Sequence, residues 1–153
     1  MQERWFLRLA VVATVGVMAG MALSGVATAG GSKLSTSLSG AEEAPGPGDP
    51  DATGTANLTL NQGTETVCYD LSWANVDGTV TAAHIHEAPA NQPGPVVVPL
   101  FTAQSFAGTA RASNCVGADP ALIKDIRKNP SDYYVNVHSS VLPAGAIRGQ
   151  LGD

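Results

Sequence analysis

The three histidines of this chain are the side chains best suited to chemistry, and two of them are close in sequence. His84 and His86 form a His-x-His pair in a segment rich in β-branched and small residues. Side chains two positions apart on a β-strand point to the same face, about 6.6 Å apart along it. Two imidazoles placed in this way can share one metal ion, and zinc and copper both bind neutral imidazole nitrogens.

His138 lies far from this pair in sequence, on a segment that also alternates with a period of two. Its side chain has the same parity as those of Tyr134 and Asn136, so all three are expected on one face. If this strand lies beside the one that carries His84 and His86, three imidazoles and an open coordination position would suit zinc or copper.

A purely structural cluster is the alternative to a metal site, and it is the arrangement we expect first. Histidine can fill a polar niche by donating to a backbone carbonyl and accepting from a neighbouring group. Arg148 would then pair with Glu87 or with a backbone carbonyl. Asn136 and Gln150 would belong to the same hydrogen-bonded motif, which would fix the order of the strands.

Catalysis by a nucleophile or by paired carboxylates is not expected. Ser139 and Ser140 follow His138, but adjacency in sequence does not make a triad, and the sequence contains no Gly-x-Ser-x-Gly segment. A group of acidic residues in a loop rich in proline and glycine is expected to form a solvated surface: Glu42, Glu43, Asp49 and Asp51. We therefore do not expect an enzyme.

The elements that must position the histidines are mainly short strands with a period of two. The expected strands are 34–38, 56–60, 67–73, 80–86, 96–101, 105–112, 133–138 and 146–151. Pro95 and Pro99 place the strand 96–101 at an edge. A single helix begins after the capping residue Asp119 and ends at Asn129. The sequence thus predicts an all-β fold, an antiparallel Greek-key β-sandwich of about eight strands with one short helix.

The first 29 residues have the layout of a secretory signal peptide. Residues 9–26 are apolar or small and uncharged, and the Ala-Thr-Ala sequence at 27–29 supplies a cleavage site. An uncleaved membrane anchor is the alternative, because the apolar segment approaches the length of a bilayer span. We expect residues 30–153 to form a single domain that is secreted or held at the cell surface.

Charge and cysteine content are consistent with an extracytoplasmic protein. The chain has a formal net charge of −5, so a nucleic-acid partner is not expected, and a membrane is expected only through an uncleaved signal segment. In an exported chain the two cysteines, Cys68 and Cys115, are expected to form a disulfide. Two buried thiols or a soft-metal site are the alternatives.

Two pairs of segments have a recognisable pattern: AHIHEAP at 83–89 with GPVVVPL at 94–100, and YYVNVHS at 133–139 with GAIRGQL at 145–151. They resemble the signature of the CHRD domain, first described in chordin and also found singly in secreted bacterial proteins. The resemblance covers roughly residues 34–151 and implies a β fold outside the cytoplasm. It implies no established activity for the family, so we predict a binding or structural module with an unknown protein or cell-surface partner.

The segment around His84 also looks like the His-x-His-Glu strand of copper–zinc superoxide dismutase, which is a Greek-key β-sandwich. That enzyme uses six histidines and an aspartate for its two metals, whereas this chain has three histidines in total. Dismutase activity is therefore not expected. A single copper or zinc site, possible on His84, His86 and His138, remains the alternative to a metal-free module.

Overall fold

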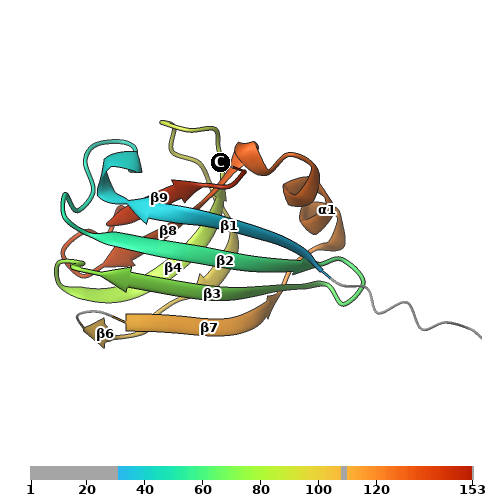
Figure 1. Cartoon of the computed structure of the whole chain (residues 1–153), viewed down its shortest axis with the longest axis horizontal. Helices are drawn as coiled ribbons and strands as arrows, with labels where there is room; N and C mark the ends of the chain where they lie inside the picture. The colour runs from blue at the N-terminus through green and yellow to red at the C-terminus, as the bar shows by residue number, and fades with distance from the viewer. Residues whose placement is uncertain (1–30, 108–109, 153) are drawn as a thin grey trace, which may run out of the picture.

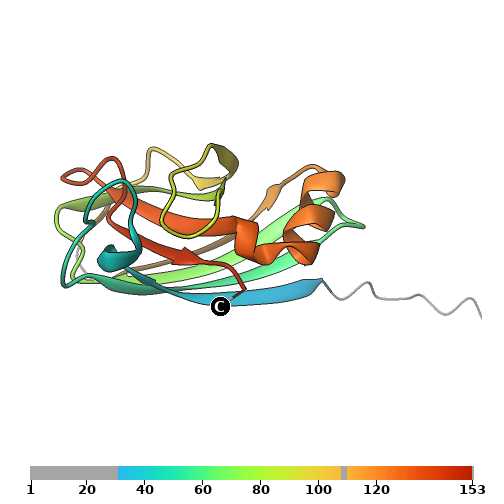
Figure 2. The same cartoon turned by 90° about the horizontal axis from the view of Figure 1, so that it is seen from above.

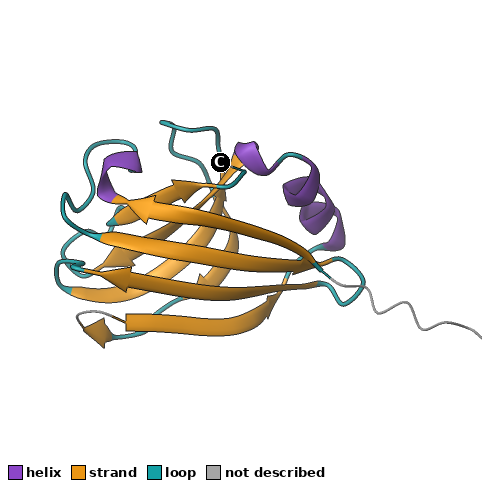
Figure 3. Ribbon diagram, viewed as in Figure 1, coloured by secondary structure: helices purple, strands orange, loops and turns teal. Residues whose placement is uncertain are grey.

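A computed structural model of the chain describes residues 31–107 and 110–152, and most of its regular structure is β-strand (Figures 1 and 3). The strands are β1 (Ser32–Ser39), β2 (Thr53–Asn61), β3 (Thr66–Ala74), β4 (Thr79–Glu87), β5 (Val96–Phe101), β6 (Phe106–Ala107), β7 (Ala110–Gly117), β8 (Tyr133–Ser139) and β9 (Ile147–Gln150). The helical elements are α1 (Pro120–Lys128) and the 3-10 turns η1 (Gly40–Glu42) and η2 (Pro130–Asp132). This confirms the predicted all-β class with one short helix.

The strands form a continuous antiparallel sheet that closes over itself into two layers (Figures 1 and 2). Its order is β5-β4-β8-β9-β1-β2-β3-β7, with the short β6 paired to β4. The prediction that strand 96–101 lies at an edge is confirmed, since the order begins with β5. Several neighbouring strands are not consecutive in sequence, as in Greek-key folds. One such crossover places β4 beside β8 and so brings the two histidine-bearing segments together.

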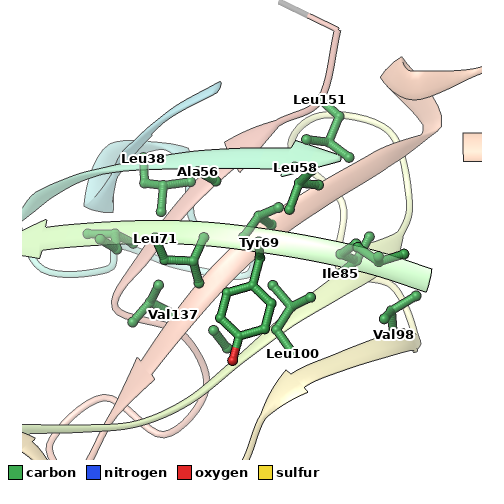
Figure 4. Close-up of a cluster of buried hydrophobic side chains, with 14 of the residues drawn as sticks. Leu38, Ala56, Leu58, Tyr69, Leu71, Ile85, Val98, Leu100, Val137 and Leu151 are labelled. Atoms are coloured by element: carbon green, nitrogen blue, oxygen red, sulfur yellow. The ribbon is translucent and has the colours of Figure 1, made fainter. Parts of the chain in front are cut away.

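The core lies between the two layers and is built from alternate residues of the strands. Leu58 and Leu71 are fully buried on β2 and β3, and Ile85 and Val137 face them from β4 and β8 (Figure 4). Full burial of one such side chain contributes about 1.5–3 kcal/mol relative to its exposure. Alternate residues of β4 and β8, such as Ile85 and Val137, point into the core. The residues between them therefore point to the outer face of the sheet, and these include all three histidines.

The predicted strands agree with the structure to within three residues at each end, except one, which is divided in two. The sequence predicts a strand over 105–112 that ends before Cys115, but β6 covers only two residues and β7 continues through Cys115 to Gly117. The expectation fails because β7 is at the other edge of the sheet and is mostly exposed, so its polar residues give no clear alternation. The longer β7 places Cys115 directly opposite Cys68 of β3, and the predicted disulfide joins them.

The predicted helix is confirmed, including its first and last residues. The Asp119 side chain accepts hydrogen bonds from the backbone N–H groups of Ala121 and Leu122, and Pro120 occupies the first helical position. Ile123 and Ile126 are fully buried against the sheet. Within the described part of the chain, no helix is long and apolar enough to cross a membrane. The predicted signal peptide lies outside the described residues.

Candidate metal centre

The register of β4 against β8 brings the three histidines together on the outer face of the sheet. His84 lies opposite Asn136, His86 opposite Tyr134, and His138 opposite Ala82. All of these side chains point away from the core, because Ile85 and its neighbours of the other parity fill it. The requirement that His138 lie near the His-x-His pair is therefore met.

The three imidazoles are close enough to share one ion. Nδ1 of His84 lies 3.0 Å from Nε2 of His138. One ring nitrogen from each histidine can be chosen such that all three lie within 4.8 Å of one another. Two nitrogens that each bind a zinc ion at about 2.0–2.1 Å in a tetrahedral site are roughly 3.4 Å apart, so modest side-chain adjustment would suffice.

Backbone carbonyls fix which nitrogen carries the proton on two of the rings. Nδ1 of His86 lies 2.9 Å from the carbonyl oxygen of Gly94, and Nδ1 of His138 lies 3.1 Å from that of Pro143. A carbonyl oxygen only accepts, so each Nδ1 is the donor. In the neutral ring Nε2 then carries the lone pair. Metal-binding histidines in other proteins likewise donate from the ring nitrogen that does not hold the metal, often to a backbone carbonyl.

The surroundings hold the histidines in the neutral form that a metal requires. Burial, together with the nearby His138 and His86, lowers the pKa of His84 to about 4. Burial also lowers the pKa of His86 and of His138, against the opposing effect of the carbonyls that accept from them. Near neutral pH a metal ion would therefore not have to displace a proton from Nε2 of His86 or His138, whereas the proton of His84 would have to move from Nδ1 to Nε2.

The three histidines differ in how far solvent can reach them. His86 and His138 are 8% and 9% exposed, whereas His84 is partly exposed. Nε2 of His86 and Oδ1 of Asn136 are both buried and make no hydrogen bond to the rest of the described residues, although the Asn136 side chain lies close enough to raise the pKa of His86. An unpaired buried acceptor is costly unless a ligand satisfies it. The arrangement thus leaves lone pairs available at a site that solvent reaches past His84.

The residues predicted as a structural motif divide into two groups. Asn136, Arg148 and Gln150 are buried on the same outer face as the histidines. Arg148 donates to backbone carbonyls, which is one of its two predicted pairings, and Gln150 also bonds to backbone. Glu87, in contrast, is exposed and has the opposite parity on β4, so the structure does not bring it into this cluster.

Sequence reasoning overlooked the role of Tyr134 and of two loops. The Tyr134 ring is stacked on His86, with centroids 4.8 Å apart and planes 9° from parallel. Its parity, which matches that of His138, was the available signal. The carbonyls of Gly94 and Pro143 had no sequence signal, because any residue supplies a carbonyl and only the loop path decides where it points.

Two acidic side chains in the loop between β1 and β2 are not solvated, contrary to the prediction. Asp49 is 0% exposed, and its carboxylate accepts a hydrogen bond from the backbone N–H of Asp77 at 2.6 Å. Glu43 is partly buried beside Gly145, and its Oε1 has no partner among the described residues. Burial raises the pKa of Glu43 to about 7, although Arg148 opposes this. The prediction of a solvated surface is thus wrong for these two residues.

Comparison with known proteins identifies a family but no individual relative. The family model described as CHRD domain matches residues 34–151, which span β1 through β9 and include all three histidines. No curated protein and no solved structure matches the chain.

Proposed function

The chain belongs to the CHRD domain family, an extracellular type of module without a known activity, and we propose that this member is exported and binds one transition-metal ion. The ligands are Nδ1 of His84 and Nε2 of both His86 and His138. Three neutral nitrogens without a thiolate or carboxylate among them suit zinc or copper. The predicted signal peptide and the disulfide support export.

The observation that carries this proposal is the unpaired Nε2 of His86. That nitrogen is buried and makes no hydrogen bond of ordinary geometry among the described residues, while its Nδ1 donates to Gly94; the side chain that interacts with this ring is that of Asn136. A histidine that served only to join strands would be expected to use both nitrogens, since a buried unsatisfied acceptor costs about 1–3 kcal/mol. A metal ion bound to Nε2 removes this cost.

A metal-free structural module remains the second candidate, because one hydrogen bond supports it. His84 and His138 approach to 3.0 Å, and since Nδ1 of His138 donates to Pro143, Nδ1 of His84 would be the donor. In that arrangement the cluster joins β4 to β8 without an ion, and the protein acts through a partner surface. In that arrangement Nε2 of His86 would have to accept from the amide of Asn136, whose Oδ1 makes no hydrogen bond of ordinary geometry either.

The deciding experiment is a metal count on the chain purified without a histidine tag. Zinc and copper are loaded separately, excess ion is removed, and bound metal is measured by elemental analysis. The chain has three histidines and all of them lie in the cluster, so no other histidine can contribute to the measured metal. We expect about one ion per chain in the wild type and in Asn57→Ala, an exposed change in the other layer. We expect none in His86→Ala, and a folded wild type that binds neither metal refutes the proposal.

A further inference from the structure

The loop 88–95 lies against the histidine cluster and is held there by side chains of β8 and β9. It connects β4 to β5 and in Figure 2 passes across β8 and β9. It contains Pro89, Pro93 and Pro95 and has no regular secondary structure, so it contributes few backbone hydrogen bonds of its own. Its position therefore depends on the side chains that bond to its carbonyls and N–H groups.

Arg148 makes the largest share of these contacts. Its Nη1 donates to the Gln92 carbonyl at 2.7 Å, and its Nη2 donates to the Pro89 carbonyl at 3.0 Å. Nη2 also donates to Oε1 of Gln150 at 2.9 Å, and the side chain of Gln150 in turn donates to the Ala88 carbonyl at 2.8 Å. Arg148 is only 1% exposed, so these bonds are sheltered from water.

The same guanidinium is connected to His86 through Tyr134. The carbon at the centre of the guanidinium lies 3.4 Å from the centroid of the Tyr134 ring, on which His86 also stacks. The Tyr134 hydroxyl accepts a hydrogen bond from the Gly94 N–H at 3.2 Å. Arg148 and Tyr134 thus fix the segment that ends in the Gly94 carbonyl, which is the acceptor for Nδ1 of His86.

We propose that Arg148 is a positioning residue for the metal centre: it holds loop 88–95 so that the Gly94 carbonyl keeps the proton of His86 on Nδ1 and leaves Nε2 free. This inference rests on the proposed function, because a free Nε2 serves binding only if a metal is the ligand. At Gly94 the loop passes so close to the end of β4 that a Cβ atom there would lie 2.0 Å from the Glu87 carbonyl oxygen.

The hydrogen bonds that Arg148 makes require the planar, forked guanidinium of arginine. Two carbonyls and one amide oxygen accept from its two terminal nitrogens at different angles. A lysine ammonium retains the charge but is a single point and cannot reproduce this planar fork. Arg148→Lys should therefore loosen the loop while keeping a cation on the outer face. Arg111→Lys is the matched control, because Arg111 pairs with Asp70 on the other layer.

The test uses the ¹⁵N-labelled chain without metal, in which nitrogen–proton correlation spectra identify the tautomer of each imidazole. We expect a single Nδ1–H tautomer for His86 in the wild type and in Arg111→Lys, and a mixture in Arg148→Lys. His138 is an internal control, since its Nδ1 donates to the other loop, at Pro143. Zinc affinity should fall by about 10–100-fold in Arg148→Lys, the range for lost outer-shell partners.

A folded Arg148→Lys variant in which His86 keeps one tautomer overturns the inference. If that variant does not fold, the wild type still decides, because the terminal guanidinium protons of Arg148 must then be protected from exchange with solvent. Freely exchanging protons would contradict the inference. A tautomer change in Arg148→Lys together with a wild type that binds no metal would support the positioning role and refute the proposed function.

Discussion

The partly buried Glu43 carboxylate should make the domain less stable as the pH rises, which is unusual for an acidic side chain. Burial raises its pKa from an ordinary 4.5 to about 7. For a group whose pKa is higher in the folded state, the stabilisation is complete below the unfolded value and is lost as the pH rises through the folded value. The window for this residue therefore runs from about pH 4.5 to about pH 7.

The size of the effect follows from the shift. A difference of one pKa unit corresponds to about 1.4 kcal/mol, so the change between these pH limits is at most about 3.5 kcal/mol, and the partial exposure of the carboxylate reduces it. The carboxylate lies next to Gly145 and near Arg148, where Glu43→Gln keeps the shape and removes the charge. The variant should match the wild type at pH 4.5 and be roughly 2–3 kcal/mol more stable at pH 8.

Urea unfolding of both proteins from pH 4.5 to pH 8 measures this difference. The histidines are present in both proteins, so any contribution from their titration cancels when the two free energies are subtracted. Glu42→Gln provides the control, because Glu42 is the exposed neighbour of Glu43. A difference between wild type and Glu43→Gln that does not change with pH would refute the buried placement of this carboxylate.

Three further measurements test the fold and the site. Replacing both Cys68 and Cys115 with alanine should lower the free energy of unfolding by about 4 kcal/mol, as expected for a closed loop of this length; a loss below about 1 kcal/mol in urea would contradict that. Leu71→Ala, at a site 0% exposed, should cost about 2–5 kcal/mol, whereas Val96→Ala, 48% exposed, should cost about 0.5 kcal/mol or less; equal losses would refute the assigned core. Because its pKa is lowered, the neutral His84 contributes stability that is complete above about pH 6.5 and is lost as the pH falls through about 4. Between pH 7 and pH 4 the wild type should therefore lose more stability than His84→Asn. The opposite order would contradict the lowered pKa.

The local pattern of the sequence was sufficient to predict the elements and the face on which the histidines lie. The alternation in β2 and β3, and the Asp119–Pro120 start of α1, depend on neighbours in sequence and were predicted correctly. The common face of His84 and His86 follows from the same periodicity. The weakly patterned β7 was misjudged, because an exposed edge strand does not have to alternate.

The assembled site depends on information that a single sequence does not carry. The register that sets His84 opposite Asn136 arises from a crossover between β4 and β8, and a shift by one residue would send His138 to the core. The Gly94 and Pro143 carbonyls are placed by loop paths. The burial of Asp49, which accepts from the Asp77 N–H, likewise depends on how a loop returns to the sheet.

Atom-resolved metal binding is the most direct test of the central claim. The ¹⁵N signals of the three imidazoles would be followed while zinc is added to the metal-free chain up to one equivalent. The account predicts that all three histidines respond together and saturate at about one ion, with the metal on Nδ1 of His84 and on Nε2 of His86 and His138. Imidazole signals that stay unchanged in the folded protein, for zinc and for copper(I) alike, would contradict it.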